Sequence, residues 1–176
     1  MAWLVGLGLA MAACGGDSSS PTCTGTGCTC ADSACSCAAG QDCKTACGED
    51  DCSLACTSSA KCEGNTNGAL ELACNDSSQC KGAGGDDSEL TCTGSSNCDF
   101  KVGDDATVVC NTSATCKIQV GADSTIACSD SSTCNIKCDG NCKATCTGSS
   151  ECAVTCGAAA TPATMCGTGV FACGPC

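Results

Sequence analysis

The 176-residue chain carries 27 cysteines, no histidine, no tyrosine and a net charge of −12. Leu, Ile, Val and Phe make up about one residue in ten, which is too little for an ordinary packed core and would by itself predict disorder. The cysteines change that conclusion, because they indicate the covalent framework that small extracytoplasmic domains use where burial is insufficient. The acidic balance argues against nucleic acid as a partner, since phosphate binding needs clustered positive charge.

Residues 1–13 are predicted to be a signal peptide. The apolar run 2–13 is shorter than the ~20 residues that span a bilayer, and it has the length of the apolar part of a secretory signal. It ends in Met11-Ala12-Ala13-Cys14, which resembles the lipobox of bacterial lipoproteins. The resemblance implies that Cys14 is lipidated and becomes the mature N-terminus, with 14–22 as a flexible tether. An ordinary signal peptide, with Cys14 as one more disulfide partner, is the alternative; without Cys14 the remaining cysteines number 26, which is even.

Residues 23–55 hold cysteines at irregular spacing and are predicted to form an N-terminal cap or irregular coils. One Cys-x5-Cys spacing, Cys37 to Cys43, lies just before the regular repeat and is a candidate degenerate first coil. The pairs Cys28/Cys30 and Cys35/Cys37 also resemble the thiolate clusters of metallothioneins, which would bind zinc or copper(I). The export signal and the strict period further along the chain favour disulfides instead.

From residue 56 to about residue 157, the spacing Cys-x5-Cys recurs every 18 residues in six copies. The cysteines of this repeat are Cys56, Cys62, Cys74, Cys80, Cys92, Cys98, Cys110, Cys116, Cys128, Cys134, Cys146 and Cys152. Between the pairs, apolar and polar residues alternate with period 2, as in Cys116-Lys117-Ile118-Gln119-Val120. A fixed period combined with strand-type alternation predicts a β-solenoid, in which each repeat is one coil.

The predicted fold is all-β: a disulfide-laddered parallel β-solenoid with 18-residue coils and irregular Cys-rich caps. Numbering each coil from its first cysteine, positions 1, 7, 9, 11, 15 and 17 are expected to face inward, with strands at 7–11 and 15–1. Each cysteine pair is expected to close within its own coil, although neighbouring coils ~4.8 Å apart are also within disulfide range. Residues 158–176 are predicted to form a Cys-rich C-terminal cap.

Aspartates in successive turns are candidate calcium ligands: Asp86, Asp87, Asp104, Asp105 and Asp123, which follow a glycine in each turn. The stretch 82–87 resembles the Gly/Asp nonapeptide of bacterial β-rolls, and that resemblance implies calcium binding. The alternative interpretation is that these are solvated turn residues without a ligand.

Two segments, 91–98 and 145–152, resemble the Thr-Cys-Thr coils of beetle antifreeze proteins, which are disulfide-laddered β-solenoids whose flat rows of threonines bind ice. The threonines do not recur in the other coils, so ice binding is a further alternative rather than the main hypothesis.

The sequence shows no histidine and no nucleophile–base pair, so we do not expect an enzyme. No cofactor is expected apart from the calcium considered above. The leading hypothesis is a non-catalytic lipoprotein that is extracytoplasmic and lipid-anchored to a membrane of the bacterial cell envelope. Its role would be structural or interactive, with an unidentified protein or glycan as partner.

Overall fold

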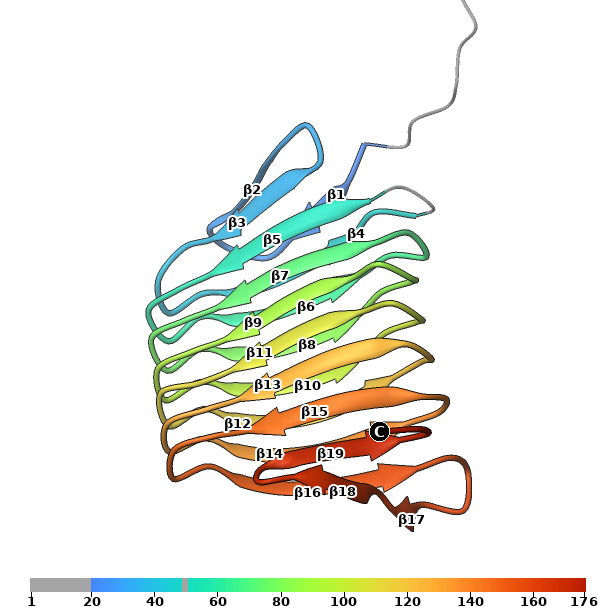
Figure 1. The fold of residues 1–176 in the computed structure, drawn as a ribbon. Coiled ribbons are helices and arrows are strands. Elements are labelled where there is room, and N and C mark those ends of the chain that lie inside the picture. The colour runs from blue at the N-terminus through green and yellow to red at the C-terminus, as the bar shows by residue number, and fades with distance from the viewer. Residues whose placement is uncertain (1–19, 49–50) are drawn as a thin grey trace, which may run out of the picture.

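The computed structural model describes residues 20–48 and 51–176, and these residues form a two-sheet β-solenoid (Figure 1). Sheet A contains, in spatial order, β1 (Thr22–Thr24), β4 (Asp42–Ala46), β6 (Lys61–Asn65), β8 (Gln79–Ala83), β10 (Asn97–Lys101), β12 (Thr115–Val120), β14 (Thr133–Cys138), β16 (Glu151–Cys156) and β17 (Thr161–Pro162). Sheet B contains β18 (Thr164–Gly167), β19 (Val170–Cys173), β15 (Cys142–Cys146), β13 (Ser124–Cys128), β11 (Thr107–Cys110), β9 (Glu89–Cys92), β7 (Leu70–Cys74), β5 (Cys52–Cys56), β3 (Ala34–Cys37) and β2 (Cys28–Ala31). Each coil therefore gives one strand to each sheet.

The strands of successive coils pair in parallel and in one register. Cys98 of β10 lies beside Cys116 of β12, which lies beside Cys134 of β14, so neighbours in these strands are 18 residues apart in the chain. The parallel stack begins before the predicted boundary at residue 56, because β3 pairs in parallel with β5 and β4 pairs in parallel with β6. The coil that contains Cys37 and Cys43 is thus the first coil of the parallel stack, offset from the next by 19 residues rather than 18. The predicted fold class and the 18-residue coil are confirmed.

The interior is a thin layer of cystines and small clusters of aliphatic side chains. Leu72, Leu90, Val108 and Ile126 stack in sheet B and are at most 1 % exposed. The facing column of sheet A changes from Gly64 and Gly82 to Phe100, Ile118 and Ile136. A Cβ atom on Gly82 would lie 2.9 Å from Cδ2 of Leu72, so the leucines of the early coils already fill the space that later coils fill from sheet A.

One buried column was not among the predicted inward positions. Position 5 of the coil holds small residues that are at most 1 % exposed: Ala60, Ser78, Ser96, Ala114 and Ser132. The reason is the tight turn before them, where the first of these coils has Ser58 and Ser59 at φ 53° and 66° and the amide of Ala60 donates to the carbonyl of Thr57. This backbone path directs the next side chain into the core, where only a small residue fits.

Antiparallel strands close both ends of both sheets. At the N-terminal end β1 pairs with β4 and β2 pairs with β3; at the C-terminal end β17 pairs with β16, and β18 pairs with β19, which lies on β15. Figure 1 shows these short elements lying across the ends of the stack. Short, irregular terminal strands protect a stack of parallel strands from pairing with another chain through an open edge.

Candidate functional site

The cysteines of the repeat form a column of bridges within the coils. The six repeat bridges are Cys56–Cys62, Cys74–Cys80, Cys92–Cys98, Cys110–Cys116, Cys128–Cys134 and Cys146–Cys152. The other bridges are Cys23–Cys28, Cys30–Cys35, Cys37–Cys43, Cys47–Cys52, Cys138–Cys142, Cys156–Cys173 and Cys166–Cys176. All 26 cysteines of the described residues are therefore paired with one another. Cys14, the predicted lipidation site, lies outside the described residues.

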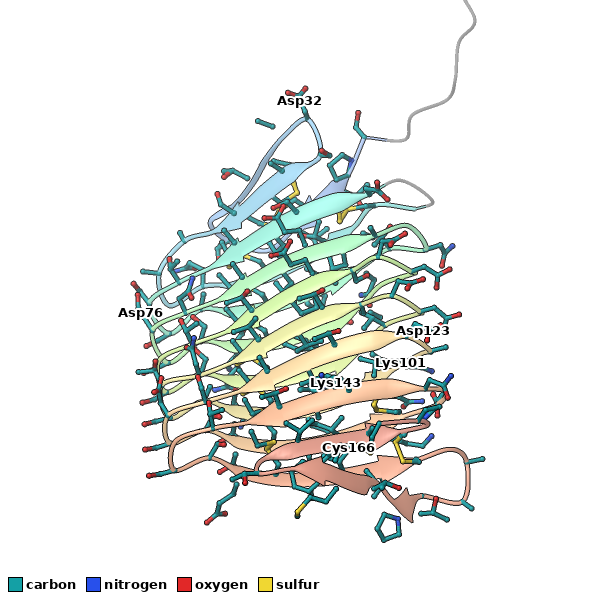
Figure 2. All side chains as sticks on the ribbon, viewed as in Figure 1. Asp32, Asp76, Lys101, Asp123, Lys143 and Cys166 are labelled. Carbon is teal, nitrogen blue, oxygen red and sulfur yellow. A yellow bond between two sulfur atoms is a disulfide. The ribbon has the colours of Figure 1, made fainter. Side chains whose placement is uncertain are left out.

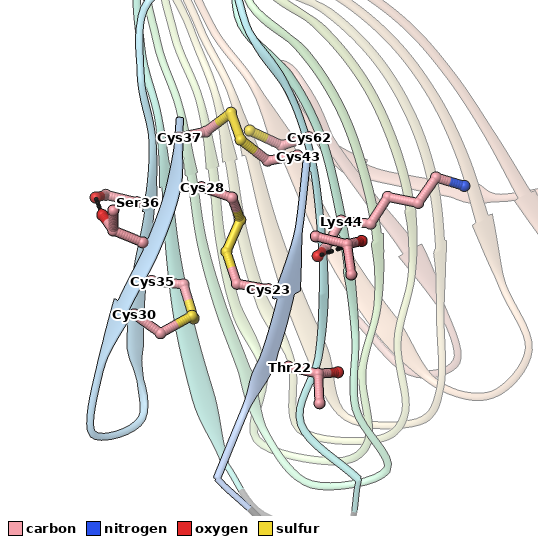
Figure 3. The surroundings of a disulfide bond; sticks show 12 residues. Thr22, Cys23, Cys28, Cys30, Cys35, Ser36, Cys37, Cys43, Lys44 and Cys62 are labelled. Carbon is pink, nitrogen blue, oxygen red and sulfur yellow. Dashed lines mark hydrogen bonds between the residues drawn. A yellow bond between two sulfur atoms is a disulfide. The ribbon is translucent and has the colours of Figure 1, made fainter. Parts of the chain in front are cut away.

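The cysteines considered for a metal cluster are consumed by these bridges. Figure 3 shows that Cys28 is bound to Cys23, that Cys30 is bound to Cys35, and that Cys37 is bound to Cys43. Sulfur atoms of neighbouring bridges do lie close together, and those of Cys74, Cys92 and Cys98 are within 4.8 Å of one another. A zinc or copper(I) site needs thiolates, which a disulfide does not supply, so the oxidised chain offers no such ligand in this cap.

Two of the candidate calcium ligands make structural hydrogen bonds between coils. Asp86 Oδ1 accepts from the amide of Asp104 at 2.8 Å, and Asp104 Oδ1 accepts from the amide of Ala122 at 2.6 Å. The glycine at the start of each turn is required for this contact, because a Cβ atom on Gly103 would lie 2.1 Å from Asp86 Oδ1. Each carboxylate thus satisfies a backbone donor of the coil that follows it.

The remaining candidates, Asp87, Asp105 and Asp123, are exposed turn residues with φ of 58°, 55° and 55°. Figure 2 shows Asp123 on one turn edge of the stack and Asp76 on the opposite one. Among the described residues, no three carboxylate oxygens are grouped within 4.8 Å of one another. Calcium binding stays a prediction that rests on the row of aspartates.

The outer face of sheet B carries the residues that resemble an ice-binding array. Thr91 and Thr93 flank Cys92, but Ala73 and Asn75 take these places in the coil before, and the Thr93 hydroxyl donates to Asn75 Oδ1 at 2.6 Å. A hydroxyl that is bonded within the protein is less available to an external lattice. Ice binding stays a prediction as well.

The outer face of sheet A is the charged face of the solenoid and the feature that the sequence reasoning missed. It carries six of the seven lysines, at positions 44, 61, 81, 101, 117 and 137, against three carboxylates on the same strands, Asp42, Glu63 and Asp99. In the middle of the face, one residue from each of five successive strands forms a column of alternating sign, which we call the charge column: Lys44, Glu63, Lys81, Asp99 and Lys117. In the sequence, all five residues occupy position 8 of their coils.

Ion pairs connect the charge column at its two ends. Lys44 Nζ lies 2.9 Å from Glu63 Oε2, and Lys117 Nζ lies 3.1 Å from Asp99 Oδ2. The hydrogen bond from Lys44 lowers the pKa of Glu63 below its ordinary value, against a smaller opposing effect of burial. Lys81, between these two pairs, makes no ion pair within the described part of the chain. Lys81 does act on Glu63 at longer range, since its charge is among those that lower the pKa of that carboxyl. The three lysines and two carboxylates leave the column with a net charge of +1.

A groove of about 550 Å³ runs over the N-terminal half of this face. Its floor includes Lys61, Gln79, Lys81 and Asn97, and the loop at Thr24–Gly25 forms part of its wall. These side chains can donate to and accept hydrogen bonds from a polar partner, and the lysines can pair with carboxylates. No aromatic side chain lines the groove. Sheet A is therefore suited to a polar, charged partner rather than an apolar one.

Comparison of the chain with protein-family models, with curated proteins and with solved structures gives no match. None of the described residues belongs to a helix long and apolar enough to cross a membrane. The arguments for function consequently rest on the geometry of the chain itself.

Proposed function

We propose that the chain is a non-catalytic lipoprotein of a bacterial cell envelope, in which a rigid solenoid presents sheet A to a binding partner. The observation that carries the anchor is the complete pairing of the 26 described cysteines. It leaves no described cysteine as a partner for Cys14. A thiol without an intrachain partner, placed directly after Met11-Ala12-Ala13, suits acylation better than a structural bridge.

The density of disulfides is consistent with an extracytoplasmic location, because such bridges persist in oxidising compartments. The position of β1 supports the proposed orientation: the chain enters the fold at Thr22, in the N-terminal cap (Figure 1). An anchor at Cys14 would hold this cap toward the membrane and leave the coils and the C-terminal cap further out. Sheet A, which runs along the length of the stack, would then be accessible from the side.

The proposal is tested by replacing the acylated thiol. Cells that express the chain with Cys14→Ser should release it from the membrane fraction, and the intact mass should lack the diacylglyceryl increment of the parent. Ser20→Ala, in the same tether, is the matched control and should stay with the membranes. A Cys14→Ser chain that partitions into detergent as the parent does would exclude lipid anchoring at this residue.

Calcium binding is the second candidate function, supported by the exposed aspartates that follow one another along one turn edge. The amide of Asp87 donates to the carbonyl of Asp104, and the amide of Asp105 donates to the carbonyl of Ala122, so these turns are stacked. A bound divalent cation would reduce the repulsion between stacked carboxylates. If calcium is bound, adding EDTA should lower the thermal midpoint of the oxidised protein; an unchanged midpoint would exclude this function.

A further inference from the structure

The charge column of sheet A is electrostatically complementary to a second copy of itself, in addition to forming ion pairs within one chain. Charges alternate in sign from one strand to the next at a spacing of ~4.8 Å. A two-fold axis that runs parallel to the strands, between two neighbouring strands, places charges of opposite sign face to face wherever both residues belong to the charge column. An isologous contact requires this kind of self-complementary patch.

We propose that two copies of the chain associate face to face through sheet A, about a two-fold axis that runs parallel to the strands and lies between β8 and β10. The inference rests on the proposed function in taking sheet A as the interaction face, and it does not depend on the anchor at Cys14. In this arrangement Lys81 faces Asp99 of the second copy, and Glu63 faces Lys117 of the second copy. Because the axis relates the copies, each of these pairs occurs twice.

The flanking columns permit the same arrangement, because charged residues there face neutral ones. In the column before the charge column, Asp42 faces Thr133 of the second copy and Lys61 faces Thr115. In the column after it, Lys101 faces Ala83 of the second copy and Lys137 faces Ala46. These pairings follow from the strand register. An axis that passes through β8 itself would instead bring Glu63 against Asp99 and Lys44 against Lys117, so the alternation favours an axis between two strands. Of these, the axis between β8 and β10 overlaps the whole run of strands from β1 to β16.

The position of Lys81 and the size of the face agree with this arrangement. Lys81 has no ion-pair partner within the described part of its own chain, and the proposed axis gives it Asp99 of the second copy. The strands β1 to β16 of sheet A make a face ~38 Å long and ~16 Å wide, or about 600 Å² on each copy. The total of about 1,200 Å² lies at the lower end of specific protein interfaces. A polar contact of this size predicts a weak dimer that salt dissociates.

The test begins with sedimentation of the full-length chain, both as the parent and with Cys14→Ser, at low and at high ionic strength. We expect a dimer in about 20 mM salt and a monomer in about 1 M salt, where the screening length falls to about 3 Å. A zero-length carbodiimide should also link Glu63 to Lys117. Within one chain these residues are three strands apart, ~14 Å, so this link forms only between copies.

Charge exchange separates an interface from a role in the fold. Glu63→Lys and Lys117→Glu, each alone, should weaken the dimer at least tenfold, and the two together should restore it, although the pairs to Lys44 and Asp99 within each chain remain broken. Lys143→Glu, on sheet B, is the matched control and should leave the dimer unchanged. A parent that is monomeric at low salt without the Glu63–Lys117 link, or a double variant that does not recover, would overturn the proposal. Neither result bears on membrane release by Cys14→Ser.

Discussion

Replacing the central bridge, by Cys110→Ser with Cys116→Ser, is expected to lower the free energy of unfolding by about 4–8 kcal/mol. The sequence separation of 6 closes a ring of seven residues, and loop-closure entropy assigns about 2.3 kcal/mol to such a ring. Cys110 and Cys116 are at most 1 % exposed, so the hydroxyl of each new serine would be buried without a hydrogen-bond partner, at a cost of about 1–3 kcal/mol each. The pair Cys110→Ala with Cys116→Ala removes the bridge without the hydroxyls and should recover most of the second loss.

The bridge Cys166–Cys176 in the C-terminal cap provides a comparison that separates the loop-closure entropy from the cost of burying hydroxyls. Its separation of 10 closes a longer ring, which loop-closure entropy values at about 2.8 kcal/mol, but Cys176 is exposed and Cys166 only partly buried. Cys166→Ser with Cys176→Ser should therefore cost less than the central pair despite its longer loop. The measurement is guanidinium unfolding of the oxidised proteins, followed by circular dichroism. A terminal variant that loses as much stability as the central serine variant would refute the reasoning from burial.

Three further predictions follow from the same contacts. Complete reduction in metal-free buffer should abolish the β-type circular dichroism, because Leu, Ile, Val and Phe are only about a tenth of the residues and bury too little apolar surface to hold the coils together. A reduced protein that keeps this spectrum would contradict the prediction. Lys44 lowers the pKa of Glu63, so the stabilisation by this ion pair is present above the ordinary value of 4.5 and is lost as the pH falls through the lower folded value. The difference in thermal midpoint between the parent and Glu63→Gln should therefore shrink as the pH is lowered below 4.5, and a difference that does not change with pH would exclude the ion pair as its source. Asp86→Ala removes the acceptor of the Asp104 amide and should cost about 1 kcal/mol in chemical unfolding. Asp105→Asn keeps a residue type that tolerates the left-handed backbone at this position and removes no side-chain hydrogen bond in the described structure, so it should cost less; equal losses would be evidence against the inter-coil bond.

The sequence alone was sufficient for the repeating part of the fold. The return of cysteine at a fixed interval, with alternation between pairs, predicted the coil length, the parallel stacking and the assignment of Phe100, Ile118 and Ile136 to the interior. These features depend only on which residues recur along the chain. In a solenoid, recurrence at the coil length is equivalent to contact, so a one-dimensional pattern fixes the neighbours in space.

The tertiary structure decided what depends on the path of the backbone within a coil and at its ends. The burial of Ser96 follows from the turn before it, and the role of Asp86 follows from the approach of the next coil to its carboxylate. The antiparallel caps contain pairings that the 18-residue period does not predict, such as the disulfide between Cys156 and Cys173. The charge column lies between these cases: its residues recur at one position of the coil, but alternation in sign hides the recurrence from a search for similar residues. Periodicity thus determines which residues stack, whereas local backbone geometry and the terminal strands determine which way side chains point and where the stack stops.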